Sequence, residues 1–167
     1  MKRNILVWAL LIFSFGCTSQ RSGQLTQQEM DQIKKDVKPV LDAIIDKFQK
    51  LDAEGAMQYY WNSPDFIALG GDGSRLDYQA DKKLAIDAVN TATSMEFSTV
   101  RSDFTVLAKD LVLCAWLGKG TIELKSGDKD ISDPYAVTFI FKHIDGQWKV
   151  IHYHESGTYK REKAAKK

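Results

Sequence analysis

The sequence predicts an α+β domain in which helices cover one face of a curved antiparallel sheet. Three observations predict this class. Apolar residues recur at helical spacing over residues 30–51, a second helical pattern covers residues 77–90, and four strand-like segments follow from residue 96 onward. Helices followed by a run of strands are typical of a sheet with its helices gathered on one side.

The first predicted helix covers residues 30–51. Its apolar positions are separated by three or four residues: Met30, Ile33, Val37, Leu41, Ile44, Phe48 and Leu51. Such steps place these side chains on one face of a helix. Pro39 lies inside this pattern, and proline removes a helix hydrogen bond and clashes with the preceding turn. We therefore expect a kink or a restart of the helix there.

A second, short helix is expected after Asp52, which suits an N-cap. It would place Met57, Tyr60 and Trp61 on one face and end at Pro64. A strand over residues 66–69 then leads into the turn "GGDG", and residues 74–76 can pair back across that turn. The third helix follows over residues 77–90, with Leu84, Ile86 and Val89 among charged residues.

The remaining chain predicts a four-stranded antiparallel meander. Its strands cover residues 96–106, 111–123, 131–144 and 147–155. The segments between them, "AKD", "KSGDKD" and "IDG", suit tight antiparallel connections.

The N-terminal segment resembles the signal of a bacterial lipoprotein. Lys2 and Arg3 precede an apolar run over residues 5–15, which is too short to span a membrane, and Gly16-Cys17 ends it. This pattern predicts a signal peptide over residues 1–16, lipid on Cys17 and a polar linker over residues 17–29. The protein would then be anchored to a bacterial membrane in the cell envelope. An ordinary secretory signal with a chance cysteine is the alternative.

Composition narrows the class of protein. The 167 residues are 44% hydrophobic and 27% charged, as in a globular domain, and the net charge is +1. Acids and bases are intermixed, so we expect no nucleic-acid partner.

The apolar neighbours of Cys114 favour a buried thiol over a reactive one. The basic tail, residues 158–167, is interpreted as a solvated, frayed end, with contact to anionic lipid as the alternative.

The last predicted strand, "WKVIHYHES", contains two of the three histidines. Strict alternation along a strand places Trp148, Val150, His152, His154 and Ser156 on one face and Lys149, Ile151, Tyr153 and Glu155 on the other. The second set includes a lysine and a glutamate, so we assign the first set to the helix-covered, inward face. On the preceding strand the more apolar set is assigned inward as well: Tyr135, Val137, Phe139 and Phe141. Residues 111–117 are apolar on both faces, so one face could contact a second subunit.

Two stretches resemble a known family. "DAEGAMQYYWNSPDFIALGGDGSRLDYQADKKLAI" and "DGQWKVIHYHES" are similar to the nuclear transport factor 2-like superfamily, and within it to SnoaL-like domains. The likeness covers residues 30–156 and suggests a domain over residues 30–157. It implies a conical sheet wrapped by helices, a pocket inside the cone and a homodimer through the sheet.

The predicted pocket would be lined by aromatic side chains and the two histidines: Tyr60, Trp116, Tyr135, Phe139, His152 and His154. The leading hypothesis is that it binds a small, partly apolar molecule. One alternative is a dehydratase, isomerase or cyclase that uses His152 and His154 in proton transfer. Another is a structural dimerisation module, in which the histidines only satisfy buried hydrogen bonds.

A metal site is the least favoured reading of the histidine pair. A zinc site would need further ligands beside His152 and His154, for which Cys114 and His143 are the spare candidates. We predict no metal and no cofactor.

Overall fold

The computed structural model describes residues 24–165. The predicted signal peptide, Cys17 and the start of the linker lie outside these residues. The described elements are α1 (Gln27–Gln49), α2 (Ala53–Met57), β1 (Ile67–Leu69), β2 (Arg75–Leu76), α3 (Tyr78–Thr91), β3 (Ala92–Ala108), β4 (Leu111–Leu124), β5 (Lys129–Ile144) and β6 (Gln147–Glu162). This order confirms the predicted α+β class.

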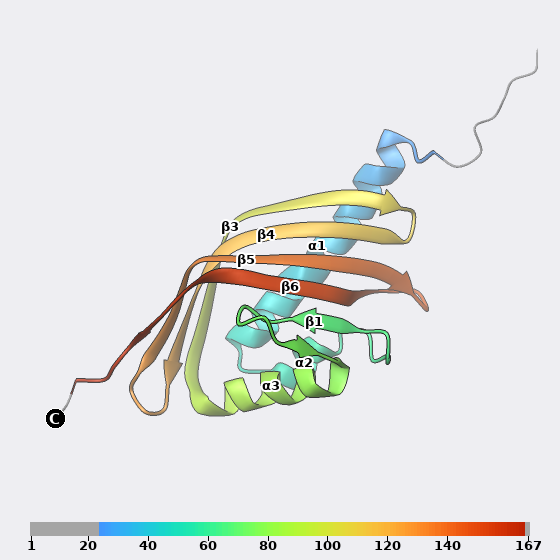
Figure 1. Ribbon diagram of the computed structural model, residues 1–167. Coiled ribbons are helices and arrows are strands. Elements are labelled where there is room, and N and C mark those ends of the chain that lie inside the picture. The colour runs from blue at the N-terminus through green and yellow to red at the C-terminus, as the bar shows by residue number, and fades with distance from the viewer. Residues whose placement is uncertain (1–23, 166–167) are drawn as a thin grey trace, which may run out of the picture.

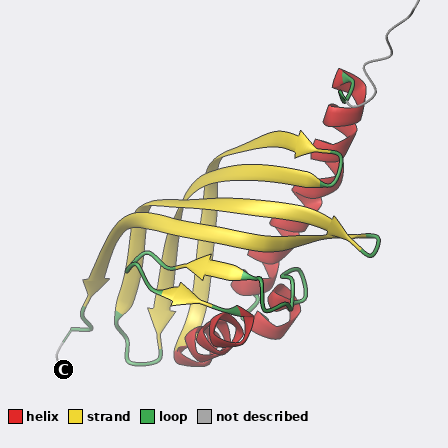
Figure 2. Ribbon diagram, turned by 45° about the vertical axis from the view of Figure 1, so that its right-hand side comes forward, coloured by secondary structure: helices red, strands yellow, loops and turns green. Residues whose placement is uncertain are grey.

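The six strands form one curved, open sheet in the order β2-β1-β6-β5-β4-β3. Neighbouring strands are antiparallel except for β1, which runs parallel to β6. The helices lie on one side of the sheet: α1 crosses behind β3–β6, and α3 lies beyond β1 at the lower edge (Figures 1 and 2). The predicted hairpin and meander are therefore both present, and the hairpin extends the meander at β6.

Side-chain caps fix the starts of the helices. The Thr26 and Glu29 side chains form a reciprocal capping box at α1, and Asp52 accepts from the Gly55 N–H at 2.8 Å at α2. Asp77 caps α3 in the same way, through the Ala80 N–H at 2.9 Å. The helix α1 continues through Pro39, so a restart there was a wrong prediction.

The second helix ends at Met57, well before Pro64. The backbone of Tyr60 instead forms an isolated bridge with Val150 of β6, and the Trp61 N–H donates to the Val150 carbonyl at 2.9 Å. Pairing with the sheet thus replaces the predicted last turns of the helix. It also fixes Tyr60 against the concave face.

The long strands bend together at one level of the sheet. Register shifts lie at Thr99–Arg101 in β3, Gly118–Gly120 in β4 and Ser132–Tyr135 in β5. An extra residue on one strand of a pair bends that strand and increases its twist. A Cβ atom at Gly118 would lie 2.3 Å from the Trp116 ring, so only glycine fits at that position. Figure 1 shows the resulting sharp turn of the sheet around the helices.

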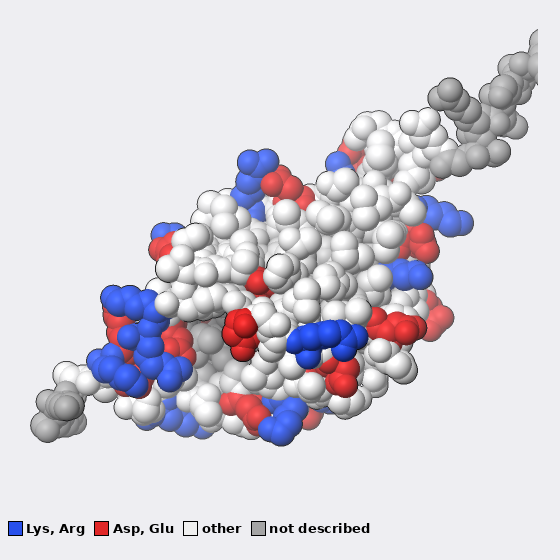
Figure 3. All heavy atoms as spheres, viewed as in Figure 1, with Lys and Arg blue, Asp and Glu red and all other residues white. Residues whose placement is uncertain are grey.

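The inward assignment of β5 is confirmed, because Val137, Phe139 and Phe141 are buried. On β4 the inward set is Val112, Cys114 and Trp116. The outward face of the sheet carries few charged atoms in Figure 3 and exposes Val100 and Leu117. The homodimer through this face stays a prediction.

The last strand is longer than predicted. It continues to Glu162, where it pairs with Lys129, and therefore includes part of the segment interpreted as a frayed tail. Arg161 donates to Asp130 and Lys160 to Glu162, which holds these bases along the sheet. No helix within residues 24–165 is long and apolar enough to cross a membrane.

Candidate functional site

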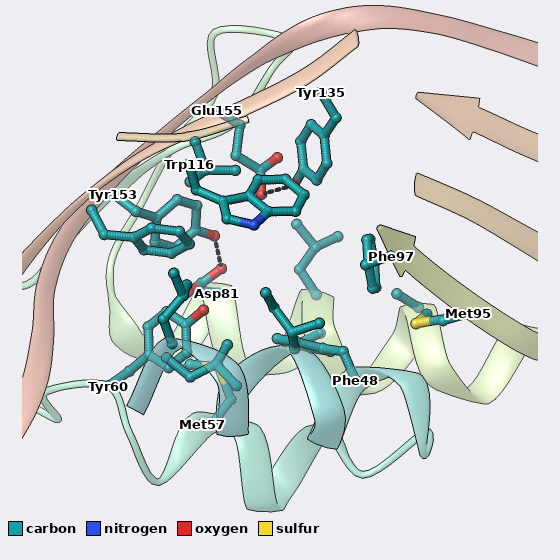
Figure 4. A pocket seen from close by; sticks show the side chains of 18 of the residues that line it. Phe48, Met57, Tyr60, Asp81, Met95, Phe97, Trp116, Tyr135, Tyr153 and Glu155 are labelled. Atoms are coloured by element: carbon teal, nitrogen blue, oxygen red, sulfur yellow. Dashed lines mark hydrogen bonds between the residues drawn. The ribbon is translucent and has the colours of Figure 1, made fainter. Parts of the chain in front are cut away.

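The concave side of the sheet and the helices enclose an open pocket with an empty volume of about 900 Å³, including solvent at its mouth. The enclosed part of the pocket measures only about 200 Å³, below the roughly 300–1,000 Å³ of sites for drug-sized ligands, so it suits a smaller molecule. Every long strand and all three helical segments contribute to its wall: Leu41, Ile44, Ile45, Phe48, Met57, Tyr60, Asp81, Leu84, Ala85, Ala88, Met95, Phe97, Trp116, Ile122, Tyr135, Val137, Phe139, Tyr153 and Glu155. The wall is mostly apolar and aromatic (Figure 4).

Four predicted pocket residues lie in this wall: Tyr60, Trp116, Tyr135 and Phe139. The two histidines do not. His154 is exposed, and half-buried His152 donates from Nδ1 to the Ile67 carbonyl at 2.8 Å, between β6 and β1. The assignment of His152 and His154 to the inward face was therefore wrong, and they are no longer candidates for catalysis in the pocket.

A β-bulge explains this error. Val150 pairs with Phe141 and His152 with Ile140, so Ile151 has no partner on β5. One extra residue reverses the alternation for the rest of the strand. Tyr153 and Glu155, assigned outward from the sequence, consequently point into the pocket.

Two carboxyl–tyrosine pairs lie in the pocket. Tyr153 of β6 donates its hydroxyl to Asp81 Oδ1 of α3 at 2.6 Å. Tyr135 of β5 donates to Glu155 Oε1 of β6 at 2.7 Å. Figure 4 shows both pairs together, with Phe48, Met95 and Phe97 toward the other end of the pocket. The pocket thus has a polar end and an apolar end.

Burial shifts the titration of both acids. It raises the pKa of Asp81 to about 6, against the opposing effect of the Tyr153 hydrogen bond. Burial likewise raises the pKa of Glu155, and the Tyr135 hydrogen bond again opposes the shift. Asp81 therefore changes its charge close to neutral pH, where a side chain can both accept and release protons.

The aromatic rings hold one another in place. Trp116 packs edge-on against Tyr135, with ring centroids 5.5 Å apart, and Tyr60 against Tyr153 at 5.9 Å. The Trp116 Nε1–H donates to Thr99 Oγ1 at 2.8 Å, so this group is already satisfied. These contacts keep the wall of the pocket in a fixed shape.

The residues considered for a metal are apart from one another. Cys114 is fully buried, and burial raises its pKa to about 12, while His143 packs on Trp148 with ring centroids 5.1 Å apart. Within residues 24–165, no group of three or more His, Cys, Asp or Glu side chains could hold a metal ion.

Asp81 was missed because no face of α3 was assigned to the pocket from the sequence. Leu84, Ile86 and Val89 served only to recognise the helix, and the face that lines the pocket is Asp81, Leu84, Ala85 and Ala88. The spacing of three, four and seven residues from Asp81 carried this signal. An aspartate at such a position is usually read as part of the solvent face.

Comparisons with known proteins agree with this architecture. A family model described as a SnoaL-like domain matches residues 37–160. A proposed scytalone dehydratase from Novosphingobium aromaticivorans DSM 12444 has a similar structure, with a TM-score of 0.73, 8% identity and coverage of 85% of this chain and 94% of that one. A hexachlorocyclohexane dehydrochlorinase gives a TM-score of 0.66 at 10% identity, covering 82% and 93%.

A nuclear transport factor 2-like superfamily protein from Salmonella enterica serovar Typhimurium LT2 gives a TM-score of 0.69 at 13% identity, covering 78% of this chain and 94% of that one. At these identities the structural likeness establishes the fold alone. A comparison with curated proteins gave no match.

Proposed function

The chain belongs to the SnoaL-like domain family, and from this premise we propose that its pocket binds a small, partly apolar molecule. The observation that carries the proposal is an open, largely apolar cavity whose few polar groups converge at one end. A structural dimerisation module would be expected to fill such a cavity with its own side chains. The side chains instead leave an enclosed space of about 200 Å³ open among them, which favours a ligand-binding or enzymatic domain.

The polar groups can orient a ligand. The Tyr60 side chain is buried, and among residues 24–165 no hydrogen bond reaches its hydroxyl, so it can donate to a bound molecule. The two carboxyl–tyrosine pairs add acceptors beside it. Apolar side chains would hold the remainder of the ligand.

Filling the pocket should weaken binding. Ala88 lies in the wall of the pocket on α3, and Ala88→Phe would place a ring in the cavity. We expect its affinity for the neutral probe 1-naphthalenemethanol to fall at least about tenfold, or ~1.4 kcal/mol, by titration calorimetry. Ala115→Phe is the matched control, because Ala115 is exposed on the outward side of β4. Equal affinity in the two variants would place the binding site elsewhere.

An enzyme of the dehydratase, isomerase or cyclase type is the second candidate. The observation that favours it is Asp81, whose raised pKa of about 6 suits a general acid or base near neutral pH. Asp81 and Glu155 would replace the histidines in the original hypothesis. Such an enzyme would lose turnover in Asp81→Asn although the variant keeps the shape of the pocket.

The proposal also includes export and a lipid anchor. It is supported by the short apolar segment over residues 5–15 and by Gly16-Cys17 directly after it. We expect Cys17→Ser to release the protein from the membrane fraction or to block its processing, whereas Thr18→Ser should leave it membrane-bound. Fractionation and mass spectrometry of the mature N-terminus measure this. An unmodified mature N-terminus at a residue other than Cys17 would refute the anchor.

A further inference from the structure

The charged side chains in the wall of the pocket are all acidic. Asp81 and Glu155 are its charged residues, and no lysine, arginine or histidine among residues 24–165 lines it. The nearest hollow along the sheet shares Glu155 and includes Lys160 and Arg161, but both bases are engaged elsewhere. Arg161 forms two hydrogen bonds with Asp130, at 2.5 and 2.6 Å, and Lys160 one with Glu162 at 2.7 Å. Of the two acids, Glu155 also has His154 nearby on the same strand, outside the pocket, whereas no base within residues 24–165 acts on Asp81.

Asp81 keeps one oxygen free inside the pocket. Its side chain is buried, with 4% of the residue exposed, and Oδ1 accepts from Tyr153. Within residues 24–165, Oδ2 receives no hydrogen bond, and every side-chain oxygen that is fully buried has a hydrogen-bond partner. Oδ2 is therefore not fully buried, and it is accessible from the pocket that Asp81 lines. A buried carboxylate with a free oxygen is costly unless a donor or a cation approaches it.

Aromatic rings surround the same end of the pocket. Tyr60 and Tyr153 lie beside Asp81, and Trp116 and Tyr135 lie beside Glu155 (Figure 4). The faces of such rings attract cations, most strongly when water is excluded. An anionic ligand would face two carboxyl groups at this end, and a neutral one would leave the Asp81 carboxylate without a counter-charge.

We propose that the ligand is an organic amine: a protonated nitrogen that lies between Asp81 and Glu155, attached to an apolar or aromatic body that extends toward Phe48, Met95 and Phe97. This assignment rests on the proposed function, because it names the class of molecule that the pocket binds. The ammonium donates to the free Asp81 oxygen, and the aromatic rings cover its remaining faces.

Protonation of Asp81 couples this binding to pH. Within residues 24–165, the titratable groups that interact with Asp81 are Tyr60, Tyr78, Tyr153 and Glu155, and none of these is a base. Burial raises the pKa of Asp81 to about 6, so the carboxylate that attracts an amine forms as the pH rises through this value. Amine binding should therefore strengthen with rising pH and release a proton from Asp81 when it occurs close to pH 6.

Three probes on one naphthalene frame test the assignment: 1-naphthylmethylamine, 1-naphthalenemethanol and 1-naphthoic acid. With the full mature chain at about pH 8, where the amine is protonated and Asp81 is charged, we expect the amine to bind at least about tenfold tighter than the alcohol, and the acid to bind weakest. Asp81→Asn should remove this preference while the alcohol still binds. Asp87→Asn is the matched control, because it removes the same charge from an exposed position on α3.

The outcomes separate this inference from the proposed function. If the alcohol binds as well as the amine, or the acid binds best, the pocket is a binding site but the amine assignment is wrong. If none of the three probes binds, the proposed function itself fails. If Asp87→Asn weakens amine binding as much as Asp81→Asn does, the preference reflects overall charge, and the assignment to the Asp81 carboxylate is overturned.

Discussion

Asp81→Asn is expected to raise the free energy of unfolding by about 2–3 kcal/mol at about pH 8, although it adds no contact. Burial raises the folded-state pKa of Asp81 from 3.8 to about 6, so between these values the folded state binds more protons than the unfolded state. Stability therefore falls as the pH rises through this window and stays lower above it. The difference between the unfolded-state and folded-state pKa of Asp81 corresponds to about 3 kcal/mol of unfolding free energy. Asp81→Asn avoids this loss because asparagine does not titrate.

The comparison requires two pH values and a control. At about pH 4 the native Asp81 is mostly protonated, so the variant and the wild type should have similar unfolding free energies in urea. Asparagine keeps an acceptor oxygen for the Tyr153 hydroxyl. Asp87→Asn, on the exposed side of the same helix, should show no gain at either pH. If Asp81→Asn is less stable than the wild type at about pH 8, interactions of the Asp81 carboxylate outweigh the free-energy cost of burying its charge, and the prediction is wrong.

The same substitution should stabilise the fold and weaken amine binding. A charge that costs stability when the pocket is empty can be neutralised by a cationic ligand, so the cost is recovered on binding. Glu155 adds to this effect, since burial raises its pKa in the same direction. Stability and ligand preference are thus two readouts of one electrostatic feature, and they can be measured on the same variant.

Local signals in the sequence were sufficient for most of the framework. The Asp52 cap, the "GGDG" turn and the apolar alternation of β5 depend on neighbours within a few positions, and the structure contains all of them. The end of α2 was wrong because Tyr60 pairs with Val150, which is distant in sequence. The acids of the pocket were missed for a related reason: pairing between β5 and β6 determines where the bulge lies, and strict alternation could not reveal it.

Tyr153→Ala and His154→Ala form a matched pair that tests this bulge. Tyr153→Ala should lower the free energy of unfolding by about 3–5 kcal/mol, as for other large aromatic residues in a core. Its residue is 8% exposed, its ring packs against Tyr60 and Phe139, and its loss leaves Asp81 without a hydrogen-bond donor. His154→Ala, one position further along the same strand, should change stability by less than about 0.5 kcal/mol, because His154 is exposed.

Urea unfolding of both variants decides between the two arrangements of β6. Strict alternation would place His154 inside and Tyr153 outside, and would therefore reverse the order of the two effects. Tyr153→Phe separates packing from hydrogen bonding: it keeps the ring and removes the hydroxyl that lowers the pKa of Asp81. The pH window over which stability falls should then extend above pH 6, because the folded-state pKa of Asp81 rises further. A window that does not move in Tyr153→Phe would show that the hydroxyl does not reach Asp81, and that β6 does not present Tyr153 to the pocket.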